Sequence, residues 1–306
     1  MIKNNKTKAV VLMLISSLSF AFMGALVKVV TDIPSFEKAL FRNLISLIVV
    51  IMVLYYRKES PWGQKENRRY LIGRSIFGTI GLVTYFYSID HLLLADASMF
   101  NRLSPFFVII FAAIFLKEKI KRYQVLSVVV AFIGVLLIIK PGFNFGNYFN
   151  TFIGLLSGVS AGAAYIFVSY LGKKENAFIV VFYFSLISTI VTAIMTIPIF
   201  IMPTLLEFIL LVGAGVFASV GQFTLTYAYK YAPAGEVSIY VYANIIFASI
   251  LGLIFFSEMP DVFSFVGYLL IILAGYIIYK YGRTFANKVA EEENVEELNN
   301  VENKVV

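Results

Sequence analysis

Long runs of apolar residues, separated by short polar connections, fill most of the chain. An α-helix rises about 1.5 Å per residue, so about 20 apolar residues cross the hydrocarbon core of a bilayer. We predict ten such helices, at residues 9–30, 35–56, 70–89, 94–116, 123–140, 150–171, 177–201, 205–229, 233–256 and 262–281. The pattern indicates an all-α integral membrane protein.

Composition agrees with a chain that is solvated mainly by lipid. Hydrophobic residues make up 60% of the 306 positions and charged residues only 14%, which is far from the balance of a soluble domain. The chain has no Cys, so disulfides, thiol catalysis and thiolate-bound metal are excluded. The net charge of +7 comes from short basic clusters between the apolar runs, so we expect no nucleic-acid partner.

The sequence resembles itself after a shift of 140 positions. Gly81 then falls on Gly221, and Glu118 falls on Glu258 at the end of the corresponding helix. We therefore expect two repeats of five helices each. The predicted units are residues 1–145 for the first repeat, 146–282 for the second, and 283–306 for an acidic, disordered cytoplasmic tail.

Basic residues predict that the second repeat is inverted. An odd number of helices per repeat reverses the direction in which the next repeat enters the membrane, and Lys and Arg gather in cytoplasmic loops. The connections 57–69 and 117–122 are rich in Lys and Arg, whereas their counterparts 197–209 and 257–262 contain none. This reversal predicts that both termini are cytoplasmic.

Inverted repeats favour transport, because two similar halves can expose a central site to alternate sides of the membrane. No nucleotide-binding motif is present, so we expect a secondary transporter that ATP does not drive directly, with no cofactor. Two alternatives remain: a flippase for a lipid-linked phosphate, and a multi-pass membrane enzyme. The enzyme is disfavoured because the chain lacks clustered carboxylates and a membrane His. We therefore expect no enzymatic activity.

Two stretches carry a family resemblance. The helix that contains Ser104-Pro105 and ends at Glu118, and the second copy that ends at Glu258, resemble the fourth helix of each repeat in EamA-type members of the drug/metabolite transporter superfamily. Ile245 stands where the second copy would have the proline. The resemblance implies ten helices in inverted repeats, a plasma or inner membrane location, and export or uptake of amino acids, metabolites or drugs.

Charged side chains within the membrane are candidates for a substrate site, because burying them in hydrocarbon is costly. Arg42 and Arg102 are the two that we identify, each about 10 Å deep from the outer start of its predicted helix. Lys28 lies near the outer end of the first helix. With no matching intramembrane acid, these cations predict an anionic or zwitterionic substrate, most simply an amino acid or a related solute. The competing interpretation is that the arginines extend to the outer headgroups.

Polar and aromatic side chains near the predicted midplane complete the candidate site. Amides rarely face lipid, so these helices should turn them inward. The predicted substrate-binding residues are Arg42, Asn101, Arg102, Ser104, Tyr85, Gln222, Thr226, Tyr240, Tyr242, Asn244, Ser17, Phe20, Ser160 and Tyr165. For each polar residue, hydrogen bonding between helices is the alternative role. The expected partners are a small-molecule substrate and the lipid bilayer, and a homodimer is left open.

Small residues along the sixth predicted helix have a structural interpretation. Gly154, Gly158 and Gly162 recur every four residues, a spacing that permits close approach of another helix. The same stretch fits the G-x-S-x-G pattern of serine hydrolases, but a membrane helix is the wrong context for that motif. We therefore predict close helix packing there.

Overall fold

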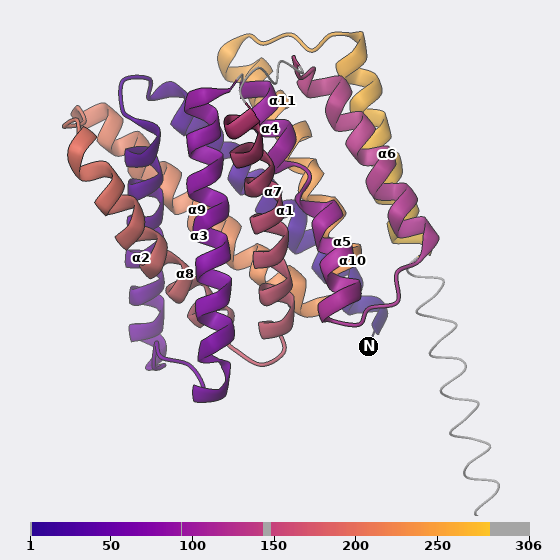
Figure 1. Cartoon of the computed structure of the whole chain (residues 1–306), viewed down its shortest axis with the longest axis horizontal. Coiled ribbons are helices and arrows are strands. Elements are labelled where there is room, and N and C mark those ends of the chain that lie inside the picture. The colour runs from indigo at the N-terminus through magenta and orange to yellow at the C-terminus, as the bar shows by residue number, and fades with distance from the viewer. Residues whose placement is uncertain (1, 93, 143–147, 282–306) are drawn as a thin grey trace, which may run out of the picture.

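A computed structural model describes residues 2–92, 94–142 and 148–281. The described part of the chain is helical throughout, with no β-strand (Figure 1). The α-helices are α1 (Ile2–Val29), α2 (Ser35–Arg57), α3 (Arg68–His91), α4 (Leu94–Asn101), α5 (Ser104–Phe115), α6 (Arg122–Ile139), α7 (Tyr148–Leu171), α8 (Ala177–Thr196), α9 (Leu205–Tyr231), α10 (Ala234–Val237) and α11 (Ala243–Phe256). Short 3₁₀ turns form η1 (Lys65–Asn67), η2 (Ile197–Ile199) and η3 (Ser238–Tyr242), and a last helix covers Val262–Tyr281.

Within this described part, nine helical segments are long and apolar enough to cross a membrane. Their exposed surfaces carry large apolar side chains such as Ile194, Leu206 and Leu269, as expected where lipid is the solvent. The predicted all-α membrane fold is thereby confirmed. Helix α3 has a suitable length of 24 residues but carries Arg74 and falls outside the nine. The count of ten spans and the cytoplasmic location of both termini therefore stay predictions.

Equivalent residues of the two repeats lie at opposite ends of the helix bundle. Lys6, near the start of α1, pairs with Glu236, which directly follows the two α10 residues whose backbone N–H groups donate to Glu118. Lys28, near the end of α1, pairs with Glu258. The two lysines are 22 residues apart, or about 33 Å along the helix. Glu118 and Glu258 thus mark opposite ends, as the inverted repeat predicts.

The packing also follows the inversion. Helix α1 of the first repeat lies along α9 of the second, and α7 of the second lies along α3 of the first. Helices α2 and α8 pack together at one side of the bundle, while α6 and the Val262–Tyr281 helix lie at the other (Figure 1). Gly134 on α6 and Gly267 on the last helix let these two backbones approach closely. The predicted boundary at residues 145–146 and the tail 283–306 fall outside the described residues.

The predicted spans 94–116 and 233–256 are present as Asp96–Phe115 and Ala234–Phe256, but each is interrupted rather than one regular helix. The first breaks at Arg102–Leu103, because Pro105 has no N–H to continue the helix and lies instead in the first turn of α5, which starts at Ser104. The second has the 3₁₀ turn Ser238–Tyr242 at the equivalent place, without a proline. Helix α8 also stops at Thr196, and Pro198 follows in η2.

The close packing predicted for the glycine stripe of α7 is present, and the segment that it contacts is the first break. A β-carbon at Gly158 would lie 2.4 Å from the carbonyl oxygen of Phe100, and one at Gly162 would lie 2.6 Å from the β-carbon of Phe107. Only glycine fits such a contact without moving the neighbouring backbone. Helix α7 therefore supports the broken segment from behind.

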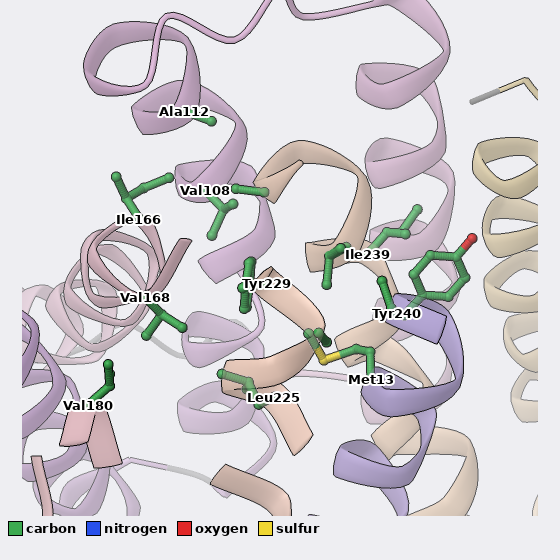
Figure 2. Close-up of a cluster of buried hydrophobic side chains, with 14 of the residues drawn as sticks. Met13, Val108, Ala112, Ile166, Val168, Val180, Leu225, Tyr229, Ile239 and Tyr240 are labelled. Carbon is green, nitrogen blue, oxygen red and sulfur yellow. The ribbon is translucent and has the colours of Figure 1, made fainter. Parts of the chain in front are cut away.

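Both repeats contribute to one buried core. Figure 2 shows Met13 on α1, Val108 on α5, Ile166 on α7, Leu225 on α9 and Ile239 on η3 around a common centre. Met13 and Val108 are fully buried. This core lies toward the Lys6 end of the bundle, since Met13 is only seven residues from Lys6. We call it the apolar floor, because Met13 and Leu225 also form the bottom of the cavity described next.

Candidate functional site

A cavity of about 690 Å³ lies between the two repeats, within the range of about 300–1,000 Å³ that is usual for small-molecule sites. On α1 its wall runs from Met13 to Lys28, or about 22 Å along the helix. The Lys28 end is accessible, since that side chain is about half exposed. At the other end, the apolar floor separates the cavity from the Lys6–Glu236 ion pair.

The two helix interruptions meet at the cavity wall. The hydroxyl of Tyr242, at the end of η3, donates to the carbonyl oxygen of Arg102 at 2.9 Å. These residues are 140 positions apart and are therefore equivalent in the two repeats. A side chain at the break of the second repeat thus bonds a backbone carbonyl that the break of the first repeat leaves without a helical partner. Discontinuous helices at matching positions in two repeats are the usual location of transporter binding sites.

Arg102 is oriented by a chain of hydrogen bonds. Its Nη2 donates to Oδ1 of Asn244 at 2.5 Å, and Nδ2 of Asn244 donates to the carbonyl oxygen of Ser17 at 2.9 Å. The Ser17 hydroxyl in turn donates to the carbonyl oxygen of Tyr240 at 3.1 Å. Because the Asn244 amide is neutral, it holds the Arg102 guanidinium in place without neutralising its positive charge.

Arg42 and Arg74 also line the cavity. Arg74, on α3, is 3% exposed, stacks on the ring of Phe184 at 4.2 Å and donates to Oε1 of Gln222 at 3.3 Å. Its Nε and Nη1 have no hydrogen-bond partner, and neither does the Nε of Arg42. Arg42, Arg74 and Arg102 thus line the same cavity, together with Tyr165.

Lys28 and Glu258 form an ion pair at the open end of the cavity. The Lys28 ammonium also lies 4.7 Å from the ring centre of Phe256. Beside this end, the Lys140 side chain donates to Asp261 and holds the pKa of that carboxyl at about 2, well below its usual value. The expectation that Lys28 acts as a third unpaired cation was wrong, because Glu258 from the other repeat neutralises it.

Ten of the fourteen predicted substrate-binding residues line the cavity, although no bound molecule tests their role. These are Ser17, Phe20, Arg42, Tyr85, Asn101, Arg102, Ser104, Tyr165, Gln222 and Asn244. They come from both repeats and from helices far apart in the sequence. The inward orientation predicted for the three amides Asn101, Gln222 and Asn244 is confirmed.

The other four predicted residues are not among those that line the cavity. Thr226 donates to the carbonyl oxygen of Gln222 on its own helix, and the Tyr240 hydroxyl donates to the carbonyl oxygen of Gly275 at 3.0 Å, toward the last helix (Figure 2). Tyr242 binds the Arg102 carbonyl, and Ser160 lies where α7 meets Gly81 of α3. Hydrogen bonding and packing between helices were the alternative roles considered for them.

Sequence reasoning missed Arg74. It counted two intramembrane arginines, whereas Arg74 lies six residues into α3 and is buried. The predicted helix 70–89 left Arg74 only four residues from its cytoplasmic end, whereas α3 starts at Arg68 and carries Arg74 about 9 Å along the axis. Its neighbours Ile72 and Ile76 are the available signal, because an arginine between apolar residues of a predicted span indicates an interior position.

The helical fold defines a multi-pass membrane protein, and a cavity of the size of a small-molecule site lies between its two repeats. The model of the EamA-like transporter family matches residues 7–140 and again residues 149–280. The chain belongs to this family, within the drug/metabolite transporter superfamily, and is a membrane transporter.

Named relatives agree with this assignment. The chain is 35% identical over 268 residues to the pseudopaline exporter CntI of Pseudomonas aeruginosa, covering 87% of this chain and 93% of the relative. It is 30% identical to human solute carrier family 35 member G1, covering 85% and 75%. A crystal structure that is 15% identical aligns with a TM-score of 0.82 over 92% of this chain, which shows a shared fold.

Proposed function

We propose that this protein is a secondary transporter that moves small organic anions or zwitterions, amino acids and related metabolites among them, by alternating access. The observation that carries the proposal is the cavity between the repeats, which is lined by three arginines, accessible at one end and blocked by the apolar floor at the other. A solute that enters at the Lys28 end reaches the arginines but not the opposite face.

The two repeat-equivalent glutamates support a second conformation. At the blocked end, the Glu118 carboxylate accepts hydrogen bonds from the backbone N–H groups of Ala234 and Gly235 at 3.0 and 3.2 Å. At the accessible end, Glu258 instead pairs with Lys28. Halves of similar sequence have two arrangements of similar free energy available. Exchange of the two arrangements would bring Glu258 to the start of α4 and open the Glu118 end.

The positions of the basic loops indicate the side of the membrane to which the cavity opens. If the Lys- and Arg-rich connections are cytoplasmic, the cavity opens to the outside in this conformation and the apolar floor faces the cytoplasm. Export is the proposed direction, in line with the Pseudomonas aeruginosa relative that is named an exporter.

Single-cysteine labelling tests alternating access directly, because the chain has no Cys of its own. Ser249→Cys places a thiol in the cavity, and Thr226→Cys places one beside the floor, where the native side chain is 1% exposed. A membrane-impermeant maleimide should modify Ser249→Cys from the open side. Transported solute should slow that reaction and accelerate modification of Thr226→Cys from the opposite side.

The control is Thr7→Cys, an exposed position at the Lys6 end of α1. Its labelling should not depend on solute. Labelling of Ser249→Cys and Thr226→Cys from the same side of the membrane, with or without solute, would rule out alternating access through this cavity.

A further inference from the structure

We infer that the solute carries at least two negative charges, with one anionic group bound between Arg42 and Arg74 and another near Arg102. This inference rests on the proposed function and narrows its substrate class, since it disfavours a zwitterion with a single carboxylate. Two anionic groups can be carboxylates or a phosphate ester together with a carboxylate. Both kinds of solute would bring at least two negative charges into the cavity.

The first step of the argument is the charge of the cavity. Among the described residues that line it, Lys28, Arg42, Arg74 and Arg102 are cations and Glu258 is the one acid. Lys28 and Glu258 neutralise each other at the open end. Three guanidinium charges are then left without a carboxylate among the described residues that line the cavity.

The second step is the cost of these charges. Arg74 is almost completely buried, and the charge of Arg42 is close enough to repel it. Removing an unpaired charge from water costs several kcal/mol per ion even after relaxation. Gln222 and Phe184 contribute a dipole and a ring face to Arg74, but neither supplies a negative charge. A bound anion is the remaining way to neutralise the pair.

The third step is stoichiometry. One carboxylate can accept hydrogen bonds from two guanidinium groups, which suits the unpartnered N–H groups of Arg42 and Arg74. Arg102 is held by Asn244 and needs a second anionic group. An amino acid with one carboxylate would instead bring an ammonium into a cavity that is already positive, and the lining carboxylate of Glu258 is taken by Lys28.

A matched series of ligands tests this inference on the purified wild-type protein. Butanoate, butanedioate and propane-1,2,3-tricarboxylate differ mainly in the number of carboxylates, 3-phosphoglycerate combines a phosphate ester with one carboxylate, and alanine represents the zwitterions. Calorimetry at constant ionic strength should show that the dissociation constant falls at least tenfold from one to two carboxylates. Comparison of the phosphate with butanedioate decides between the two sources of charge. Equal or tighter binding of butanoate or alanine would overturn the inference.

Arg74→Gln tests where the charge acts. The ratio of tricarboxylate to monocarboxylate affinity should fall at least tenfold in this variant, because one guanidinium is lost from the pair. Arg122→Gln makes the same change at an exposed position at the start of α6 and should leave the ratio unchanged. A folded Arg74→Gln variant with the wild-type ratio would contradict the proposed site. If Arg74→Gln does not fold, the same ratio is measured in Arg42→Gln, where an unchanged ratio would contradict the site in the same way.

Transport by the same compounds separates this inference from the proposed function. In proteoliposomes, counterflow of a dicarboxylate or tricarboxylate supports both. Polyanions that bind tightly but never cross would contradict the transport proposal and leave the charge inference standing. Faster counterflow of alanine than of any polyanion would contradict the charge inference and support transport.

Discussion

At the residue scale, the site depends on how a few polar side chains hold charge. Asn244 fixes Arg102 through its amide oxygen while its amide nitrogen is anchored on Ser17. A neutral partner orients the guanidinium without consuming its charge, so the charge stays available to a solute. Gln222 does the same for Arg74. The choice of amides over carboxylates at these two positions is therefore a condition for the anion binding that we propose.

Replacing one amide by a carboxylate tests this condition. In Asn244→Asp, the new carboxylate would form an ion pair with Arg102 and compete with the solute anion. We expect the KM of transport to rise at least tenfold, equivalent to about 1.4 kcal/mol, with little change in Tm. Asn5→Asp adds the same charge at an exposed position outside the cavity and should change neither. An unchanged KM in Asn244→Asp would exclude Arg102 from the anion site.

Removing the guanidinium altogether is the stronger change. Arg102→Ala deletes both the charge and the contact with Asn244, so we expect transport to be lost while the protein still reaches the membrane. Uptake or counterflow, normalised to the protein in the membrane fraction, measures this. Wild-type kinetics in Arg102→Ala would show that the residue only stabilises the helix break.

At the element scale, the broken helices and the glycine stripe behind them belong together. The break at Arg102–Leu103 brings the backbone of Phe100 within reach of α7, and Gly158 is the residue that permits this contact. Helices in lipid gain little from apolar burial against each other, so close backbone packing is a main source of their association. The stripe therefore holds the broken segment at the cavity wall.

Gly158→Ala should destabilise the protein, because its β-carbon would meet the Phe100 carbonyl at 2.4 Å. Gly24→Ala is the matched control, since a β-carbon there meets nothing within 4 Å. Both changes improve intrinsic helix propensity by about 1 kcal/mol, so their difference reports packing. We expect Gly158→Ala to be less stable than Gly24→Ala by about 1–3 kcal/mol, measured as a lower Tm in detergent. Equal Tm values would show that the contact relaxes at no cost.

At the scale of the whole molecule, the equivalent glutamates of the two repeats make different contacts at the two ends of the bundle. Glu118 accepts from backbone amides at the closed end, and Glu258 pairs with Lys28 at the open end. The structure is asymmetric although the sequence is duplicated, as the proposed exchange between two conformations requires. The apolar floor adds to the barrier, since opening it exposes Met13 and Leu225 to water.

Glu118→Gln should weaken the closed end, because a neutral amide accepts from the two backbone N–H groups less strongly than a carboxylate. A loss of about 1 kcal/mol corresponds to a fivefold shift of the conformational equilibrium. Thr226→Cys should then react several times faster with maleimide from the closed side. Glu258→Gln, the equivalent change at the open end, should not accelerate this reaction. Equal effects of the two variants would contradict the assigned conformations.

The spans, the duplication and most of the polar lining could be predicted from the sequence, because they follow from general constraints. Hydrocarbon demands about 20 apolar residues per helix, a constant offset reveals a repeat, and the cost of charge in lipid turns residues such as Arg42, Arg102 and Asn244 inward. The break at Pro105 has a visible cause that the prediction of one helix overlooked.

Only the tertiary structure decided which polar residue faces the cavity and which is used in hydrogen bonds within or between helices. Thr226 and Gln222 lie one turn apart on α9, yet Gln222 faces Arg74 while Thr226 bonds its own backbone. The break at Ser238–Tyr242 has no proline, and the pairing of Lys28 with Glu258 joins residues 230 positions apart. These features depend on how each helix is rotated about its axis and on which residues of the other repeat lie beside it. The pattern of residues along the sequence contains neither kind of information.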